Sequence, residues 1–245
     1  MRGYAKSGVA DAIREAGGGI FAVTSEPHSL AAEAEQSWKF GFPAIGDPHH
    51  EIIGECRERG WLDLFVNDAT LLVKARSWAS HPKGYFQPGV LALTSEGRVL
   101  YRWRCRPTRK NVGGAVERPT PEHVWAEAQS RRTGTTEEPE LDDTPALDTK
   151  APPWPLFILM LLAHGWFVRP KPFPLGRAEE KRSSNPLAVV PRLVGFIGAW
   201  VAAFVFLPTG WVALALATWG VLVWPGVAEI HREFQNVPSG EPEPI

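Results

Sequence analysis

The 245-residue sequence has only two cysteines, Cys56 and Cys105, and almost no net charge. Two cysteines are too few for a disulfide-stapled scaffold or a four-cysteine zinc site, so both classes are excluded. The formal charge of −1 creates no overall field that would draw the protein to nucleic acid or to an anionic surface. The informative features therefore lie in how the residues are distributed along the chain.

Charged and apolar residues are unevenly distributed. Residues 1–133 carry the mixed charges of an ordinary soluble domain. Residues 134–150, GTTEEPELDDTPALDTK, carry six acids and one lysine among threonine, proline and glycine. This segment has too few apolar residues to offset its ordering entropy, so we predict a solvated acidic linker. Residues 151–245 hold six of the eleven tryptophans and long uncharged runs, which are typical of a membrane region.

Two apolar runs in this last region are predicted to span a membrane. The run 193–207 has no polar side chain, and the run 211–228 has only Thr218. At 1.5 Å per residue they reach about 22–27 Å, close to a hydrocarbon core of about 30 Å. Only Pro208-Thr209-Gly210 separates them, which predicts an antiparallel helical hairpin anchored in the lipid bilayer. The alternative is a buried hairpin inside a soluble protein.

A third run, 155–168, has a length that fits a short span, a re-entrant segment or an interfacial helix. The loop after it, 169–192, is rich in lysine and arginine and is expected on the cytoplasmic side. If 155–168 does not cross, the N-terminal domain is cytoplasmic. If it does cross, that domain must be translocated, although the N-terminus has no apolar signal core. We expect the first arrangement, an integral membrane protein with a cytoplasmic N-terminal domain.

The N-terminal part alternates amphipathic helices with short apolar runs. The helix from Pro48 is expected to start directly after Asp47, with proline at its first position. A turn at Ser95-Glu96-Gly97 predicts a β-hairpin. The overall order predicts an α/β sandwich around a mixed sheet. We expect helices over 3–16, 29–40, 48–59, 68–80 and 121–131, and strands over 20–23, 42–45, 90–94 and 98–103.

Several of these segments, taken in order, are similar to a known family. They are the strand run 20–25, the Phe-Gly-Phe-Pro element at 40–43, Asp47-Pro48 and the hairpin 89–103. Together they resemble the thioredoxin-like fold of the peroxiredoxin (AhpC/TSA-type) family, over about residues 1–132. The resemblance implies a β-α-β crossover near the N-terminus and a final pair of strands in the hairpin.

The resemblance also implies a reactive thiolate, which this sequence does not place where the family has it. In peroxiredoxins the thiolate lies at the N-terminus of the helix after the first strand, where the helix dipole and an arginine lower its pKa. Here that helix is 3–16, no strand precedes it, and no cysteine starts it. We therefore expect a thioredoxin-like sandwich that lacks its first strand and catalytic loop.

Two functions are compatible with this pattern. One is a membrane-anchored binding or scaffolding module without peroxidase activity, whose protein partner the sequence does not name. The other is a thiol-dependent oxidoreductase whose N-terminal active-site strand and cysteine are missing from this chain.

Cys56 is one of two weak catalytic candidates. Arg57 and Arg59 would favour its thiolate if the side chain were exposed. Its spacing from Ile52 and Ile53 equally places it on the buried face of a helix, where a cysteine acts as a small hydrophobic residue. We expect the buried packing role.

Cys105 is the other weak candidate. Strand alternation places it on the same face as Trp103, with Arg104 and Arg106 on the opposite face, so buried packing is again expected. A disulfide with Cys56 cannot be argued from sequence, because it requires Cα atoms within about 7 Å.

The remaining polar motifs predict no cofactor, metal or nucleic acid. His49 and His50 are adjacent rather than four residues apart, so they indicate a solvated helix start rather than a chelating pair. The basic residues between 98 and 110 lack interleaved aromatic platforms and are better explained as a charged strand edge. Gly113-Gly114 lacks the strand–loop–helix context of a phosphate loop.

Overall fold

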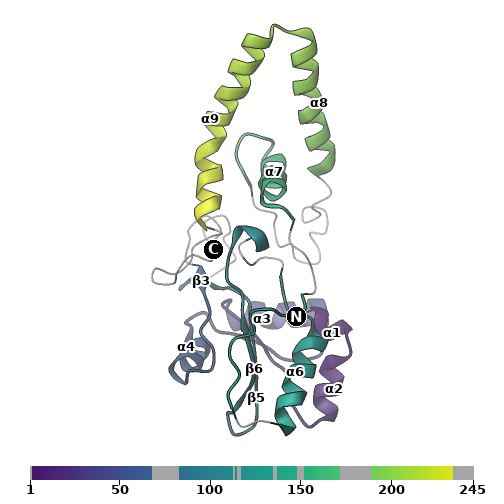
Figure 1. Cartoon of the computed structure of the whole chain (residues 1–245), viewed down its shortest axis with the longest axis vertical. Coiled ribbons are helices and arrows are strands. Elements are labelled where there is room, and N and C mark those ends of the chain that lie inside the picture. Colours follow the sequence, from purple (N-terminus) through teal and green to yellow (C-terminus); the bar gives the residue numbers. More distant parts are fainter. Residues whose placement is uncertain are drawn as a thin grey trace. The chain divides into compact units, whose positions relative to one another are not determined.

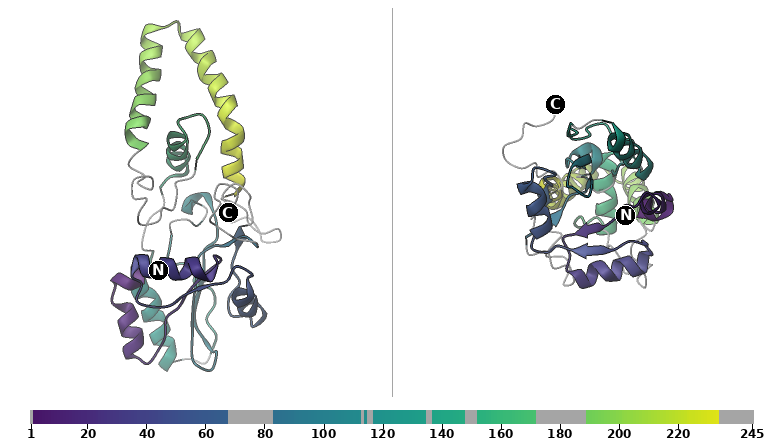
Figure 2. Two further views of the ribbon diagram at one scale, coloured as in Figure 1. Left: turned by 180° about the vertical axis from the view of Figure 1, so that it is seen from behind. Right: turned by 90° about the horizontal axis from the view of Figure 1, so that it is seen from below.

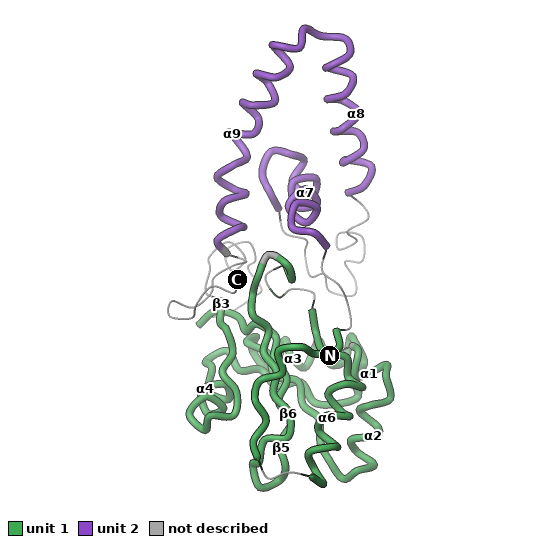
Figure 3. The backbone as a smooth tube through the Cα atoms, viewed as in Figure 1, with its two compact units in different colours: residues 1–151, 236–245 green, residues 152–235 purple. Residues whose placement is uncertain are grey.

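The computed structural model of the chain describes residues 2–67, 83–112, 114, 117–134, 137–147, 152–171 and 189–233. The chain divides into two compact units, residues 1–151 with 236–245, and residues 152–235 (Figure 3). The first unit mixes helices with short strands, and the elements described in the second are all helices. The predicted helix 68–80 and most of the basic loop 169–192 lie outside the described residues.

The first predicted helix, 3–16, is two helices in the structure. α1 (Arg2–Lys6) and α2 (Val9–Glu15) are separated at Gly8, whose φ of 76° is left-handed. A left-handed residue cannot continue an α-helix, and glycine adopts this conformation without a steric penalty. The helical periodicity on both sides of Gly8 is correct, but the single helix was wrong.

A parallel crossover forms the next part of the first unit. β1 (Ala22–Thr24) pairs in parallel with β2 (Ala44–Gly46), and α3 (His28–Trp38) connects them (Figure 2). The predicted β-α-β order is confirmed, with each strand shifted by one or two residues. Small residues let the helix approach the strands closely, and two stacked phenylalanines complete the packing. The buried cluster consists of Ala10, Ala22, Ala31, Phe40, Phe42 and Ala44.

The helix predicted from Pro48 begins three residues later. α4 (Glu51–Glu58) follows His50, which is left-handed with φ 61°, so proline is not its first residue. Asp47 still caps it from a distance, because its carboxylate accepts the N–H groups of Glu51 at 2.7 Å and of Ile53 at 3.2 Å. These are two of the N–H groups that a helix start leaves without partners.

The predicted β-hairpin is confirmed. β5 (Gly89–Leu93) pairs antiparallel with β6 (Val99–Arg104), with an irregularity at Ala92/Leu93. β3 (Val66–Asn67) and β4 (Tyr85–Phe86) form another antiparallel pair. The described strands thus form three two-stranded sheets rather than the single mixed sheet that we expected.

The last helix of the first unit covers β6. The short 3₁₀ helix η1 (Arg109–Asn111) precedes α6 (Pro121–Thr133). The hydroxyl of Thr120, the residue before α6, accepts the His123 N–H at 3.3 Å. Thr120 is thus the N-cap of this helix, which starts at the predicted residue. The core that α6 and β6 share consists of Leu100, Tyr101, Trp103, Cys105, Val124 and Ala128.

Part of the predicted acidic linker lies against the first unit. Within the described residues 137–147, the Asp142 N–H donates to the Arg102 carbonyl at 3.0 Å, and Leu147 forms a β-bridge with Pro119. The compact unit runs through this segment to residue 151. We call residues 137–147 the strap. Its composition predicted a solvated linker, and these contacts could not be foreseen from composition because they are made to residues distant in sequence.

The second unit contains a helical hairpin. α8 (Val190–Phe206) and α9 (Thr209–Glu233) are joined at Leu207-Pro208 (Figure 1). The helical break at Pro208 is as predicted, but Thr209 and Gly210, expected in the turn, already belong to α9. α7 (Trp154–His164) lies between their lower halves. The indole of Trp219 donates to the Phe167 carbonyl at 2.7 Å, which ties α9 to the turn after α7.

One described helix meets the length and apolarity needed to cross a membrane, the segment Thr209–Arg232 of α9. Only 11% of its most apolar window is buried, whereas the core helix of a soluble protein is mostly buried. α8, at 17 residues, is shorter than that criterion. Among the described residues, the structure therefore supports one apolar helix of spanning length.

Candidate functional site

Cys56 lies on α4 at the border between its buried and exposed faces. Ile53 is buried and Ile52 is exposed, so the predicted buried face includes only one of the two isoleucines. The neighbouring cations are occupied, because Arg57 pairs with Asp63 and Arg59 pairs with Glu55. Burial and nearby carboxylates raise the pKa of the Cys56 thiol, and Arg59 opposes them only in part. The arginines therefore do not activate this thiol.

Cys105 follows the last residue of β6 and is 2% exposed. Trp103 shares its buried face and Arg106 is exposed, as the alternation predicts. The side-chain amide of Asn111 donates to the Cys105 sulfur at 3.6 Å. Cys105 is thus part of the core beneath α6 and also touches a polar loop.

Asn111 organises that loop. Its Oδ1 accepts the N–H groups of Thr108 and Gly114, both at 2.8 Å, and its Nδ2 donates to the Arg106 carbonyl at 2.6 Å. Gly114 has a φ of 79°, and a Cβ there would lie 2.5 Å from the Cys105 sulfur. Only glycine satisfies both conditions, so this glycine closes the loop over the thiol rather than binding phosphate.

The electrostatics around Cys105 favour the neutral thiol. Burial raises its pKa to about 11, while the Arg118 guanidinium opposes the rise and Glu117 adds to it. Arg118 donates to the carbonyls of Gly114 at 2.9 Å and Glu117 at 2.6 Å. The arrangement holds a protonated, enclosed thiol, which is the state least suited to nucleophilic attack.

The two cysteines remain separate. Both are free thiols, one on α4 and one after β6. The structure therefore does not join them in a disulfide.

Thiol labelling at neutral pH should separate these two environments. With a pKa of about 11 in place of 9.0, Cys105 has about a hundredfold smaller thiolate fraction, and its burial adds a further barrier. Because the pKa of Cys56 is raised as well, we expect Ellman's reagent to label Cys56 at least tenfold faster than Cys105 in the full chain in detergent. Cys56→Ser and Cys105→Ser assign the two phases, and denaturant should equalise them. A Cys105 that labels natively as fast as a free thiol would contradict the closed site.

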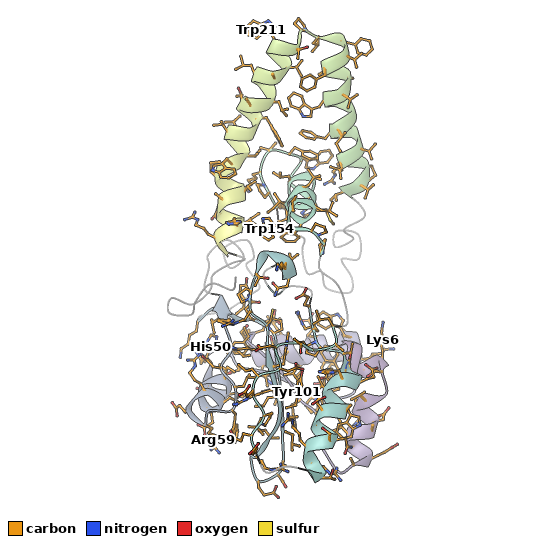
Figure 4. All side chains as sticks on the ribbon, viewed as in Figure 1. Lys6, His50, Arg59, Tyr101, Trp154 and Trp211 are labelled. Atoms are coloured by element: carbon orange, nitrogen blue, oxygen red, sulfur yellow. The ribbon has the colours of Figure 1, made fainter. Side chains whose placement is uncertain are left out.

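A second polar network, which the sequence did not predict, is centred on Asp142. Asp142 of the strap accepts from the Tyr101 hydroxyl at 2.8 Å, and the same oxygen lies 2.7 Å from Nε2 of His123. Tyr101 comes from β6 and His123 from the first turn of α6, so three segments meet at one carboxylate oxygen (Figure 4 labels Tyr101). No local spacing could have predicted it, since the partners are 41 and 19 residues from Asp142.

This network is partly shielded from solvent. Burial acts to raise the pKa of Asp142, but the hydrogen bonds from His123, Tyr101 and the Thr144 N–H outweigh it, so the pKa lies below its ordinary value. Burial and the hydrogen bond to Asp142 raise the pKa of Tyr101. The carboxylate is therefore ionised, and the phenol neutral, at physiological pH. This arrangement can fasten the strap to the first unit.

The adjacent histidines His49 and His50 differ in their surroundings. His50 is only half-exposed, since its ring lies 4.7 Å from that of Phe86 and its Nε2 is 3.2 Å from the Gly84 carbonyl. The solvated helix start expected for this residue is thus wrong, whereas His49 is exposed. Within the described residues, no three His, Cys, Asp or Glu side chains gather closely enough to hold a metal ion.

Three of the basic residues between 98 and 110 contact groups of the same unit. Arg98 donates to the Arg131 carbonyl at 3.2 Å, and Arg102 donates to the Gly60 carbonyl at 3.0 Å. Arg104 lies 3.9 Å from the Asp63 carboxylate. These three arginines therefore contact carbonyl and carboxylate groups of the same unit.

Comparison of the chain with protein-family models, with curated proteins and with solved structures gave no match.

Proposed function

We propose that this chain is a membrane-anchored binding protein whose first unit is a peroxiredoxin-like, thioredoxin-type module without peroxidase activity. The parallel β1–α3–β2 crossover, the β5–β6 hairpin and the covering helix α6 support the thioredoxin-like part of this proposal. The three separate strand pairs mark the departure from the complete family sheet.

The state of Cys105 is the observation that carries the proposal. A thiol peroxidase needs an accessible thiolate, whereas this thiol is 2% exposed and has a pKa of about 11. The pKa of Cys56 is also raised, and the cations beside it pair with carboxylates. Neither sulfur is prepared for attack on peroxide, which favours binding over catalysis.

The anchor in this proposal is the α8–α9 hairpin. α9 has 25 residues, or roughly 37 Å of helix, and α8 has 17, or roughly 25 Å, so a slightly thinned bilayer accommodates both. Large apolar side chains remain exposed along both helices, among them Val201, Val205 and Val221. Lipid tails would cover this surface without leaving backbone groups unpaired.

α7 is too short to cross beside them. Its 11 residues give roughly 16 Å of helix, about half of a hydrocarbon core. Phe167, in the turn after α7, stacks on Phe196 of α8 with ring centroids 3.7 Å apart. Such packing suits a segment that enters the hairpin and returns. This favours the topology in which 155–168 does not cross and the first unit is cytoplasmic.

A thiol-dependent oxidoreductase is the second candidate, favoured by two groups beside Cys105. Arg118 lowers the pKa of Cys105 against the effect of burial, and Asn111 donates to the sulfur. If the Gly114 loop opened, these groups would stabilise a thiolate.

Peroxide kinetics distinguish the two candidates. We expect the full chain in detergent to react with hydrogen peroxide only at the slow rate of an ordinary thiol, because both thiols are predominantly protonated. The double variant with Cys56→Ser and Cys105→Ser is the control for background reaction. Fast, saturable turnover that disappears in either single variant would establish the oxidoreductase and identify its nucleophile.

A further inference from the structure

An open hollow of about 340 Å³ lies in the first unit, and neither cysteine nor any of Tyr101, His123 and Asp142 lines it. Its walls are the loop 60–63 after α4, Arg102 and Arg104 of β6, and strap residues 140–141. This volume is in the lower range of small-molecule sites, which is about 300–1,000 Å³. Three segments distant in sequence therefore line an open hollow of ligand size.

Arg102 supplies an unmatched cation at this cavity. Its guanidinium donates to the Gly60 carbonyl at 3.0 Å, and its buried Nε–H finds no acceptor among the described residues. No carboxylate of the described residues forms an ion pair with it. A buried guanidinium N–H without an acceptor is unfavourable, and guanidinium geometry suits a carboxylate.

The other charges at the cavity are largely balanced. Asp63 lies between two arginines, 2.5 Å from Arg57 and 3.9 Å from Arg104. The Arg104 guanidinium also lies over the Phe65 ring at 4.7 Å. Glu140 is exposed and is the remaining carboxylate at the wall. Arg102 is therefore the cation available to a ligand, and Glu140 disfavours ligands of higher negative charge.

The rest of the lining is apolar. Trp61, Leu62 and Leu141 contribute to the wall. The Trp61 ring is held on one side by the Arg59 guanidinium at 4.8 Å, and it packs against Gly97 at the tip of the β5–β6 hairpin. A fixed aromatic surface beside a cation is the arrangement that recognises an anion with an apolar body.

We propose that this cavity binds a small organic monocarboxylate, with its carboxylate on Arg102 and its aromatic or branched body against Trp61 and Leu62. One unmatched cation beside Glu140 suits a single negative charge better than the two of a phosphate. This ligand class rests on the proposed binding function, and the strap residues 140–141 complete the site.

Calorimetric titration of the detergent-solubilised full chain tests the proposal, with benzoate and phenylacetate as probes. We expect saturable binding of both, at least tenfold weaker binding of their neutral amides, and no comparable binding of inorganic phosphate. Equal binding of acid and amide would overturn the carboxylate contact, and preferential phosphate binding would overturn the monocarboxylate class.

Two variants place the ligand. Arg102→Gln should weaken benzoate binding at least tenfold, whereas Glu140→Gln should strengthen it several-fold by removing a like charge. Arg98→Gln, on the same hairpin but outside the cavity wall, is the matched control and should bind as the unaltered chain does. Unchanged affinity in Arg102→Gln would overturn the assignment, as would weaker binding in Glu140→Gln.

The same preparations separate this inference from the proposed function. A chain that sediments with membranes and is inert to peroxide, yet binds no benzoate, would overturn the cavity proposal alone. Fast peroxide turnover, or loss from the membrane, would count against the proposed function while leaving a positive benzoate titration in place.

Discussion

Replacing Leu214, Val221 and Leu222 on the apolar surface of α9 by arginine is expected to release the chain from membranes during carbonate extraction. All three side chains are more than half exposed in the structure. An arginine near the centre of a span, as at Val221 and Leu222, costs about 2.5–3.5 kcal/mol, so these two oppose insertion by roughly 5–7 kcal/mol. The arginine at Leu214, nearer the end of the segment, adds a smaller cost. The unaltered chain should remain in the pellet after carbonate extraction, and most of the triple variant should appear in the supernatant.

Apolar exchanges at the same positions control for this experiment. Leu214→Ile, Val221→Leu and Leu222→Val together preserve hydrophobicity and should leave the chain in the pellet. Recovery of the unaltered chain in the carbonate supernatant would contradict the span. Retention of the arginine variant would show that α8 or another segment anchors the protein without α9.

Sequence patterns predicted the helices and strands whose formation depends on residues close together in the sequence. The hairpin around Ser95-Glu96-Gly97 was predictable because turn chemistry and flanking apolar residues point to one structure. The boundaries of α8 and α9 were close for a similar reason, since Pro208 interrupts an otherwise continuous apolar run. Thr120 was recognisable as an N-cap from its position before Pro121.

The errors arise where a single backbone conformation overrides a pattern. Gly8 divides a segment with continuous helical periodicity because it is left-handed, and periodicity carries no information about φ. His50 delays α4 in the same way, although Asp47-Pro48 has the composition of a helix start. Gly8 thereby divides one expected helix into two, and His50 shifts the start of α4 by three residues.

The candidate sites were less predictable because they join distant residues. Alternation along β6 was sufficient to bury Cys105, but not to place Asn111 or Gly114 against its sulfur. The acidic composition of the strap indicated solvation, and one of its acids instead accepts two side-chain hydrogen bonds from the first unit. Composition gives the average polarity of a segment, but it does not identify the single residue whose hydrogen bonds hold that segment in place.

Replacing that acid, Asp142, by alanine is expected to detach the strap. Tyr101 is 3% exposed, so its hydroxyl would lose its carboxylate acceptor while buried, and His123 would lose the same partner. Hydrogen bonds to a charged group contribute about 1.5–3 kcal/mol each, which is large relative to the stability of a short segment. Hydrogen exchange of residues 137–147 should rise at least tenfold in Asp142→Ala. Asp143→Ala removes a neighbouring exposed carboxylate and is the matched control, with exchange unchanged.

The same contact gives the strap a defined dependence on pH. The pKa of Asp142 lies below its ordinary value in the folded protein, whereas an aspartate in the unfolded chain has a pKa of about 3.9. The folded state binds fewer protons in this range, so the carboxylate stabilises the docked strap fully above about pH 4. That contribution disappears as the pH falls from about 4 through the lower folded pKa. Exchange of residues 137–147, corrected for the intrinsic rate, should therefore rise on acidification in the unaltered chain and change less in Asp142→Ala. Equal pH profiles for the two proteins would show that another group holds the strap.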